Sequence, residues 1–475
     1  MRFLLSALLT FRPRSIQLFG TPRNVPVLSF RRLAPYLSTG VRERNTLIES
    51  TRLSAAMAST TSRDDRCPLA STGEFLSDVD TPALILDMET FEGNLAAMKE
   101  WLISHNIGRK ERGDRPLHLR PHAKTHKTAE VALKQISHGG AVGVCVQKLD
   151  EASAILDGGV DDILVTNQIV GKKKIARLVS LLRHASKPKI DVIVDSALNV
   201  HNIASHLERE SESNDLALGV LIEINGGQNR CGVESRNEES IVEIYRSIES
   251  YAGLTFRGLH CYGGNLQHVR SPAERQSLVM AGPIAAAERA RNSLAKIGVS
   301  CDIITGGGTG TFQFEADGGV HNEIQPGSYA FMDVDYSLND DGKDRFENAL
   351  FVHTSVVSTA SSPGERTVVD AGSKAVSLDC GPPCVTRLDI NQGLSGSIDE
   401  GFTYECGGDE HGILIHSSDM CGKVLNEGDT LRMIPGHIDP TVNMHDWLIC
   451  VRKHPSGKDF IVEDTWRIRG RGPGI

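Results

Sequence analysis

The sequence feature that most constrains the fold is an alternation of short apolar segments and helical segments between about residues 115 and 335. Amphipathic helical patterns such as 173–184 and 239–251 separate the apolar segments. Eight apolar segments have the length and composition of β-strands: 117–121, 142–146, 163–166, 189–194, 218–224, 256–261, 301–305 and 329–333. This alternation predicts an α/β fold, a parallel (β/α)8 TIM barrel. An open doubly wound sheet is the alternative, but no G-x-G-x-x-G motif follows an early strand.

The C-terminal part of the chain predicts a second domain of a different kind. From about residue 340 onward, apolar segments follow one another without helices between them. These expected strands are 351–358, 366–370, 412–416, 430–433, 447–452 and 459–463. We therefore expect the barrel to span 111–337 and a mostly-β C-terminal domain to span 338–475. A lead-in strand and helix at 78–110 precede the barrel, and this strand is expected to join the β domain.

Charge is distributed unevenly along the chain, whose formal net charge is −9. Residues 1–60 contain nine Arg and two Glu, with no acidic residue before Glu43, and this leaves −16 for residues 61–475. An Arg-rich, acid-poor start is typical of a transit peptide for the mitochondrion or chloroplast. A disordered N-terminal segment, or a start at Met57, is the alternative and implies a cytoplasmic protein. The acidic remainder argues against nucleic acid as a partner, and no apolar run is long enough to span a membrane.

Ten cysteines are scattered along the chain. Cys380 and Cys384 have the spacing C-x-x-x-C, which is not that of a zinc knuckle. We therefore expect most cysteines to be reduced, buried and small hydrophobic residues, as in a reducing compartment.

Four polar motifs follow expected barrel strands, at the ends where barrels carry their chemistry. They are R-P-H-A-K-T-H-K at 120–127, N-G-G-Q-N-R-C-G at 225–232, H-C-Y-G-G-N-L-Q-H at 260–268 and T-G-G-G-T-G-T at 305–311. Because the carboxyl ends of parallel strands meet at one rim, we expect all four motifs to converge there. The residue types in these motifs therefore indicate one shared site.

The glycine-rich motif after the seventh expected strand has the composition of a phosphate cradle. Successive glycines let backbone N–H groups face an anion, and threonine hydroxyls add further donors. Alone, such a loop is equally compatible with a plain tight turn, and Lys124 alone with a solvated surface residue. A lysine, a phosphate cradle and an arginine on one rim together indicate a Schiff-base cofactor.

These motifs resemble those of the fold-type III pyridoxal-phosphate enzymes, which share their fold with alanine racemase. More narrowly, the chain resembles the family of D-threonine aldolases and D-serine dehydratases, and within it the aldolases. D-T-P-A-L from Asp80, Q-P-G-S-Y from Gln325 and D-A-G-S-K from Asp370 fit the same family. The resemblance covers about residues 78–470, which is nearly everything after the N-terminal segment.

The resemblance implies a set of pyridoxal 5'-phosphate ligands. It places the cofactor's Schiff base on Lys124, with Lys127 as the competing lysine. The other cofactor-binding residues that it implies are Arg230, Tyr262, Thr305, Gly307, Gly308, Thr309 and Tyr329. For His122 and His126, which flank Lys124, structural and functional roles both stay open.

The motif P-G-H-I-D-P-T from Pro435 adds a metal to the expectation. On a strand, His437 and Asp439 would point to the same face and could bind one cation. Such a pair alone is weak evidence for a metal site. In the family that the chain resembles, however, this position is a divalent-metal site. The dehydratases of that family typically have H-x-C there, which suits zinc, whereas Asp439 is a hard oxygen ligand for Mn²⁺ or Mg²⁺ rather than Zn²⁺. This difference favours the aldolase.

The resemblance implies a lyase that cleaves D-β-hydroxy-α-amino acids, D-threonine among them, to glycine and an aldehyde. We expect His268 to be the catalytic base for the β-hydroxyl, or else to orient the substrate only. The alternative is a D-serine or D-threo-3-hydroxyaspartate dehydratase, which yields a 2-oxo acid and ammonia. A non-catalytic pyridoxal-phosphate carrier lacks a second domain, so the β domain argues against it. The family also implies a homodimer.

Overall fold

The computed structural model describes most of the chain after its N-terminal segment: residues 66–210, 216–342, 344–359, 366–386, 398–399, 401–416, 425–457 and 459–474. The expected transit peptide or disordered segment, residues 1–60, lies outside these described residues. Among the described residues, no helix combines the length and the apolar character that crossing a membrane requires.

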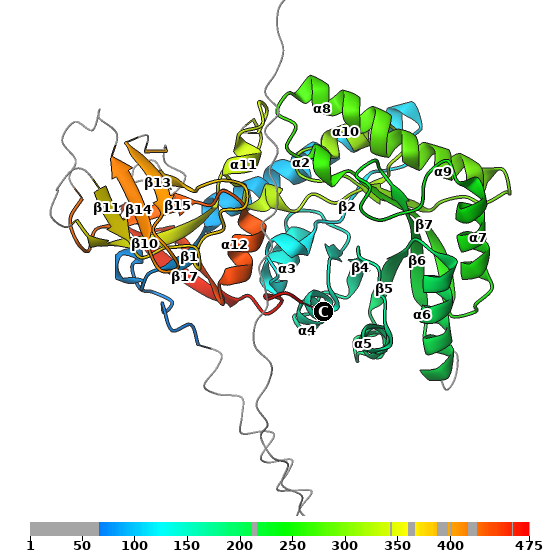
Figure 1. Cartoon of the computed structure of the whole chain (residues 1–475), viewed down its shortest axis with the longest axis horizontal. Coiled ribbons are helices and arrows are strands. Elements are labelled where there is room, and N and C mark those ends of the chain that lie inside the picture. The colour runs from blue at the N-terminus through cyan, green and yellow to red at the C-terminus, as the bar shows by residue number, and fades with distance from the viewer. Residues whose placement is uncertain are drawn as a thin grey trace, which may run out of the picture. The chain divides into compact units, whose positions relative to one another are not determined.

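Eight parallel strands form the first sheet, in the order β2-β9-β8-β7-β6-β5-β4-β3 (Figure 1). Their bounds are β2 (His118–Leu119), β3 (Val144–Val146), β4 (Asp162–Val165), β5 (Lys189–Val194), β6 (Leu218–Asn225), β7 (Leu254–Tyr262), β8 (Ile303–Gly306) and β9 (Glu323–Ile324). A parallel bridge between His122 and Cys145 links the chain after β2 to β3, the other end of this order. The sheet therefore curls into the expected TIM-like barrel.

The eighth barrel strand does not lie where the apolar pattern predicts it. Residues 329–333 instead contain part of the 3-10 turn η5 (Ser328–Ala330) and Asp333, which caps helix α11 (Val334–Ser337). The side chains of this segment are buried because they pack in a core, not because they alternate along a strand. The strand at this position of the barrel is β9, and two residues are too few to show a period of two.

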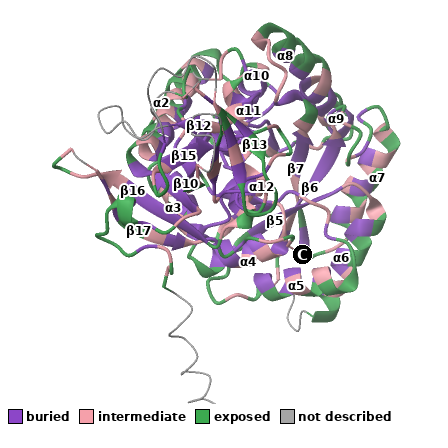
Figure 2. Ribbon diagram, turned by 60° about the vertical axis from the view of Figure 1, so that its left-hand side comes forward, coloured by how far each residue is buried: buried purple, intermediate pink, exposed green. Residues whose placement is uncertain are grey.

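Helices cover the outer side of the barrel strands (Figure 1). They are α3 (Ala129–Ser137), α4 (Leu149–Asp157), α5 (Lys172–Leu182), α6 (Ala197–Glu210), α7 (Glu238–Glu249), α8 (Pro272–Val279), α9 (Ala285–Ala295) and α10 (Phe312–Asp317), with a π-helical turn, η4 (Met280–Ile284), between α8 and α9. In α5, Ile175, Leu178, Val179 and Leu182 follow the spacing i, i+3, i+4, i+7, and all four are buried. Figure 2 shows the same division, with buried residues along the strands and exposed residues on the outer helix surfaces.

The second sheet is mostly antiparallel, as the sequence predicts for the C-terminal domain, and its main path is β13-β14-β11-β10-β1-β16-β17. Its strands are β1 (Ala83–Asp87), β10 (Leu350–Ser358), β11 (Arg366–Val369), β12 (Cys384–Thr386), β13 (Phe402–Cys406), β14 (Gly412–His416), β15 (Thr430–Ile434), β16 (Trp447–Lys453) and β17 (Phe460–Arg467). Strand β15 pairs with β10 and β12. The lead-in strand β1 lies between β10 and β16, antiparallel to the first and parallel to the second. A segment that precedes the barrel in sequence therefore occupies the middle of the second sheet.

A hydrophobic core joins the barrel to the second sheet. Helix α2 (Met88–Arg112) contributes Phe91, the segment after β9 contributes Phe331, and the sheet contributes Val352. Ile438 and Val442 of helix α12 (Ile438–Met444) belong to the same core, and α12 contacts the 3-10 turn η2 (Ala123–Thr125) of the barrel. The shared core thus fixes α12 beside η2, which contains Lys124.

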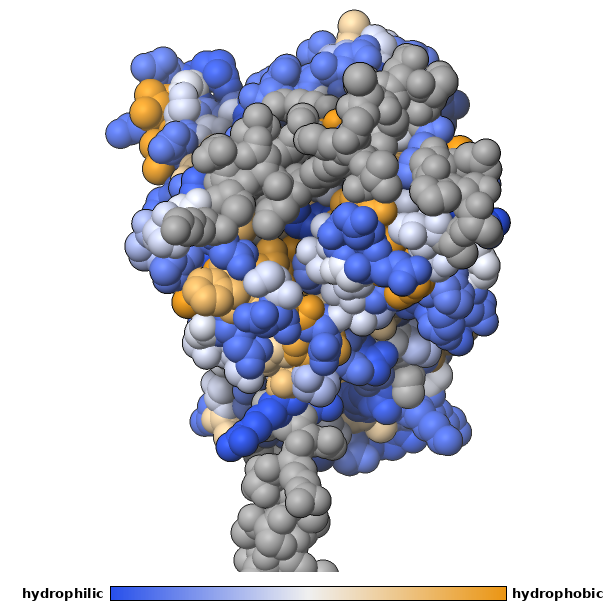
Figure 3. All heavy atoms as spheres, turned by 90° about the vertical axis from the view of Figure 1, so that its left-hand side faces the viewer, coloured by the Kyte–Doolittle hydropathy of each residue, from blue (hydrophilic) through white to orange (hydrophobic). Residues whose placement is uncertain are grey.

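On the outer face shown in Figure 3, hydrophobic residues occur in small groups among hydrophilic ones.

Candidate active site

A cavity of about 420 Å³ opens where the carboxyl ends of the barrel strands face α12. Volumes of this order are usual for sites that bind cofactors and small molecules. Eight of the expected catalytic, cofactor-binding and metal-binding residues line it: Lys124, Arg230, Tyr262, His268, Gly308, Thr309, His437 and Asp439. The structure therefore brings residues of all four barrel motifs together with the H-x-D motif of the β domain.

Lys124 lies in η2, where its own loop and the β domain hold it. The Nδ1 atom of His122 accepts a hydrogen bond from the backbone N–H of Lys124 at 3.3 Å, and His122 Nε2 lies 2.8 Å from Thr166 Oγ1. The Lys124 ammonium contacts the Asp439 carboxylate. Burial lowers the pKa of Lys124, but Asp439 and Tyr262 outweigh that effect and raise the pKa above its ordinary value. His122 is thus both hydrogen-bonded in the loop and part of the cavity wall.

The competing lysine, Lys127, is bound elsewhere. Its backbone has a φ of 54°, in the left-handed region, and turns the chain after η2. Its ammonium lies 2.9 Å from Oε1 of Glu151, whose side chain is almost fully buried. Lys127 is not part of the cavity wall.

Arg230 and Tyr262 approach each other on one side of the cavity. The guanidinium of Arg230, in the loop after β6, lies over the ring of Tyr262, at the end of β7, with 5.7 Å between the guanidinium carbon and the ring centroid. Burial raises the pKa of Tyr262 above its ordinary value, although Lys124 and Arg230 oppose the shift. Tyr262 therefore presents a neutral phenol beside two cations.

The glycine loop after β8 borders the cavity through Gly308 and Thr309. Gly307 has a φ of 77°, which favours glycine. A Cβ atom added to Gly308 would lie 2.4 Å from Oε1 of Gln267, so a larger residue there would collide with Gln267 unless that side chain moved. The Thr309 hydroxyl accepts a hydrogen bond from the backbone N–H of Tyr329 at 3.0 Å, which fixes the far side of the loop. This geometry fits a bound phosphate group.

Three of the expected cofactor ligands do not line the cavity. Thr305 is fully buried, and its hydroxyl accepts a hydrogen bond from Gln325 Nε2 at 2.7 Å. Gly307 lies behind Gly308 in the turn. The Tyr329 ring packs in the core, 5.4 Å from the ring of Phe346, so only its backbone reaches the loop. The expected cofactor ligands thus include residues that support the glycine loop as well as residues that face the cavity.

The H-x-D motif does not lie on a strand as expected. His437 is the N-cap of α12, and Asp439 lies in the first turn of this helix. The signal that sequence reasoning missed is Pro440, since proline is favoured in the first helical turn. The Asp333 carboxylate accepts hydrogen bonds from the backbone N–H groups of Tyr336, at 2.8 Å, and Ile438, at 3.1 Å, and so ties α12 to α11.

Asp439 has the properties of a cation ligand. Burial raises the pKa of its carboxyl, but Lys124 and His437 outweigh burial and lower the pKa to about 2. Its Oδ1 atom is buried and has no hydrogen-bond partner among the residues that the structure describes. Because such an unpaired carboxylate oxygen is costly, the donor set fits a bound divalent ion.

Sequence reasoning missed three polar residues at this site. Asp335 Oδ2 lies 2.9 Å from His268 Nδ1, and Asp379 Oδ2 lies 2.8 Å from His437 Nδ1. Cys380 is exposed, and its Sγ lies 3.5 Å from the same nitrogen of His437. The expectation that most cysteines are buried is wrong for the described residues, since four of their nine cysteines are buried. Isolated acidic residues, such as Asp335 in the short helix α11 and Asp379 in a loop, give no periodic or motif signal, so only the fold reveals these neighbours.

Comparisons with known proteins agree across the two domains. Residues 103–335 match the alanine racemase N-terminal domain family, and residues 349–451 match the family described as a putative serine dehydratase domain. A D-threonine aldolase of Arthrobacter sp is 39% identical over 406 residues, which cover 85% of this chain and 96% of that protein. A 3-hydroxy-D-aspartate aldolase of Paracoccus denitrificans is 38% identical, with coverage of 84% and 94%.

A solved structure gives the same result for the fold. The crystal structure of D-threonine aldolase from Filomicrobium marinum has a TM-score of 0.72 and 38% sequence identity, and covers 85% of this chain and 99% of that one. Identity at this level across both domains is enough to assign the family. The chain belongs to the alanine racemase-like family of D-threonine aldolases and D-serine dehydratases.

Proposed function

We propose that the protein is a D-threonine aldolase, dependent on pyridoxal phosphate and a divalent metal, that cleaves D-β-hydroxy-α-amino acids to glycine and an aldehyde. The observation that carries the proposal is that Asp439, a hard oxygen donor with an unpartnered oxygen, faces the same cavity as Lys124. The named relatives with 38–39% identity are aldolases, which supports the same choice.

The cofactor-binding residues follow from the cavity. Lys124 would attach the cofactor, Arg230 and Tyr262 would flank its ring, and the backbone of the glycine loop would bind its phosphate. Thr305, Gly307, Gly308, Thr309 and Tyr329 would form or support that loop. When bound, pyridoxal phosphate supplies an electron sink for the carbon–carbon bond that breaks.

His437 and Asp439 would hold Mn²⁺ or Mg²⁺ rather than Zn²⁺, because a carboxylate oxygen is a hard ligand. A divalent ion there supplies Lewis acidity for the substrate's β-hydroxyl. Both residues line the cavity, so the ion and the amino acid would share one space.

His268 would take the proton from the β-hydroxyl. Its Nδ1 lies beside Asp335, so its other nitrogen, Nε2, is the one available to the substrate. Arg270 pairs with Asp335 as well and holds that carboxylate in place. Asp335 is therefore a positioning residue for the base.

Product analysis tests the proposed function. Protein loaded with pyridoxal phosphate and Mn²⁺ is offered D-threonine, D-serine and 3-hydroxy-D-aspartate in separate reactions, with and without a chelator. Glycine and acetaldehyde from D-threonine, lost on chelation, are the expected result. Faster release of glycine from 3-hydroxy-D-aspartate would change the preferred substrate but keep the aldolase. A 2-oxo acid with ammonia would replace the aldolase by the dehydratase.

The pH profile tests the pair of His268 and Asp335. Burial lowers the pKa of His268 below its ordinary value of 6.5; Arg270, His437 and Lys124 add to this shift, and Asp335 opposes it. We therefore expect an acid limb of kcat/KM below pH 6.5.

Asp335→Asn should move that limb to lower pH, since it removes the group that raises the pKa of His268, and should lower kcat about tenfold. His268→Ala should lose the roughly 10²–10⁴-fold that a general base contributes.

The exposed Asp340→Asn, in the same segment, is the matched control and should leave the profile unchanged. An acid limb that stays in place in Asp335→Asn would contradict the role of Asp335. A kcat unchanged in His268→Ala would show that another group takes the proton.

We also propose the arrangement of the rest of the chain. Residues 1–60 direct the protein to the mitochondrion or chloroplast, 78–110 lead into a cofactor-binding barrel at 111–337, and 338–475 form the metal-binding domain. Two copies associate as a homodimer. Import of residues 1–60 fused to a fluorescent protein, and light scattering of the loaded enzyme, test these points.

A further inference from the structure

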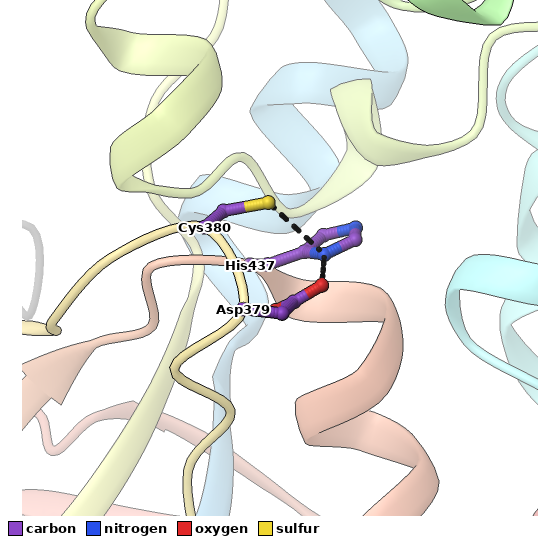
Figure 4. A group of neighbouring side chains, drawn as sticks. All are labelled: Asp379, Cys380 and His437. Carbon is purple, nitrogen blue, oxygen red and sulfur yellow. Dashed lines mark hydrogen bonds and ion pairs between the residues drawn. The ribbon is translucent and has the colours of Figure 1, made fainter. Parts of the chain in front are cut away.

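Asp379 and Cys380 both contact the ring of His437. Both lie in the loop between β11 and β12, and Figure 4 shows both side chains directed at the same nitrogen of the His437 ring. The distances to that nitrogen, Nδ1, are 2.8 Å from Asp379 Oδ2 and 3.5 Å from Cys380 Sγ. The three side chains could either bind a cation among themselves or orient the imidazole.

The carboxylate distance separates these two possibilities. Two nitrogen or oxygen ligands of one tetrahedral zinc ion, each about 2.0–2.1 Å from it, are separated by about 3.3 Å. The observed 2.8 Å is shorter and is that of a hydrogen bond. Asp379 therefore accepts the Nδ1–H proton of His437. The sulfur distance fits either arrangement and decides nothing.

The loop that carries Asp379 is tied to the helix that carries His437. The Ser377 hydroxyl donates to Asp379 Oδ1 at 2.7 Å, and the Ser377 backbone N–H donates to Thr441 Oγ1 at 3.1 Å. The Thr441 hydroxyl in turn donates to the backbone carbonyl of His437 at 2.7 Å. The carboxylate and the imidazole thus share one hydrogen-bonded network and keep their relative orientation.

A histidine that binds a metal through one nitrogen usually donates a hydrogen bond from the other to a carboxylate or carbonyl group. We propose that Asp379 is a positioning residue of this kind: it fixes the Nδ1–H tautomer of His437 and directs Nε2 toward the cavity as a metal ligand. The inference rests on the metal site of the proposed function. It adds a residue from a second segment of the β domain, the loop between β11 and β12, to that site.

Metal affinity, measured apart from catalysis, tests the proposal. Mn²⁺ binding to the cofactor-loaded protein is followed by the electron paramagnetic resonance signal of free Mn²⁺. Asp379→Ala should weaken binding about 10- to 100-fold. Asp379→Asn should weaken it less, because its amide oxygen still accepts the proton. Cys380→Ser, the adjacent control, should change affinity less than about twofold.

Cobalt provides the second measurement. If Cys380 were a ligand, the Co²⁺-loaded protein would show a thiolate charge-transfer absorption that Cys380→Ser abolishes; we expect none. That absorption, an unchanged Mn²⁺ affinity in Asp379→Ala, or a wild-type protein that binds no divalent ion would each overturn the proposal. Suppose that Mn²⁺ binding is weakened in Asp379→Ala and that the wild-type protein forms no product from D-threonine. This result would leave the proposal about Asp379 standing and reject the proposed function.

Discussion

Lys124→Arg is expected to lower D-threonine cleavage on the order of 10³-fold or more, the scale of loss when a central catalytic group is removed. Arginine keeps the positive charge beside Asp439, but its guanidinium cannot form the covalent link to the cofactor. The visible absorption of the lysine-bound cofactor should disappear with the activity. Absorption spectra and steady-state rates, recorded on the same preparation, check both losses.

Lys127→Arg is the matched control, since it lies three residues away and undergoes the same exchange. Its ammonium pairs with the buried Glu151, outside the cavity, and arginine keeps that charge. We expect normal absorption and activity within a few-fold of the wild type. The reverse result, with Lys127→Arg inactive and Lys124→Arg active, would assign the cofactor to Lys127.

Asp439→Asn is expected to have the second largest effect, a loss of more than about 100-fold in divalent-metal affinity and in the metal-dependent rate. Even the residues that only support metal ligands contribute about 10- to 100-fold, and Asp439 would be a ligand itself. Its pKa of about 2 means that the wild-type side chain is ionised at all working pH values. Titration of the loaded protein with Mn²⁺ and Mg²⁺ measures the affinity.

Asp439→Cys tests the type of ligand atom apart from its charge, because a thiolate is also negatively charged but offers sulfur instead of oxygen. A thiolate prefers zinc, so this variant should gain Zn²⁺ affinity relative to Mn²⁺. Asp446→Asn, an exposed residue at the end of α12 that pairs with Arg471, is the control and should bind metal normally. If Asp439→Asn kept full Mn²⁺ affinity, the H-x-D motif would not be the metal site.

Much of the fold and of the site could be predicted from the sequence because long repeats and dense motifs carry strong signals. Amphipathic helices such as α5 alternate with apolar strands such as β6, and this repeated alternation predicts the barrel. The four motifs could be placed on one rim because parallel strands leave no other arrangement. Lys124, Arg230, Tyr262 and Gly308 follow from that placement.

The parts of the fold and of the site that the sequence does not predict depend on contacts between distant segments. The pattern misplaces the eighth strand, because β9 has two residues and the buried Phe331 nearby belongs to a core. The spacing of His437 and Asp439 also suggests a strand, whereas His437 caps α12 and Pro440 lies in its first turn. Asp335 acquires its neighbour His268 only when α11 meets the loop after β7, and Asp379 acquires His437 only when the loop before β12 meets α12.

The central position of β1 has a consequence for synthesis of the chain. β1 pairs with residues from Leu350 and from Ile449 onward, so its two neighbours leave the ribosome long after it does. The barrel can fold during this interval because its strands are contiguous, and domains form in the order in which they are made. The second sheet, and with it α12 and Asp439, can be completed only when β16 has emerged. Nascent chains would therefore contain a folded barrel before they can hold the metal.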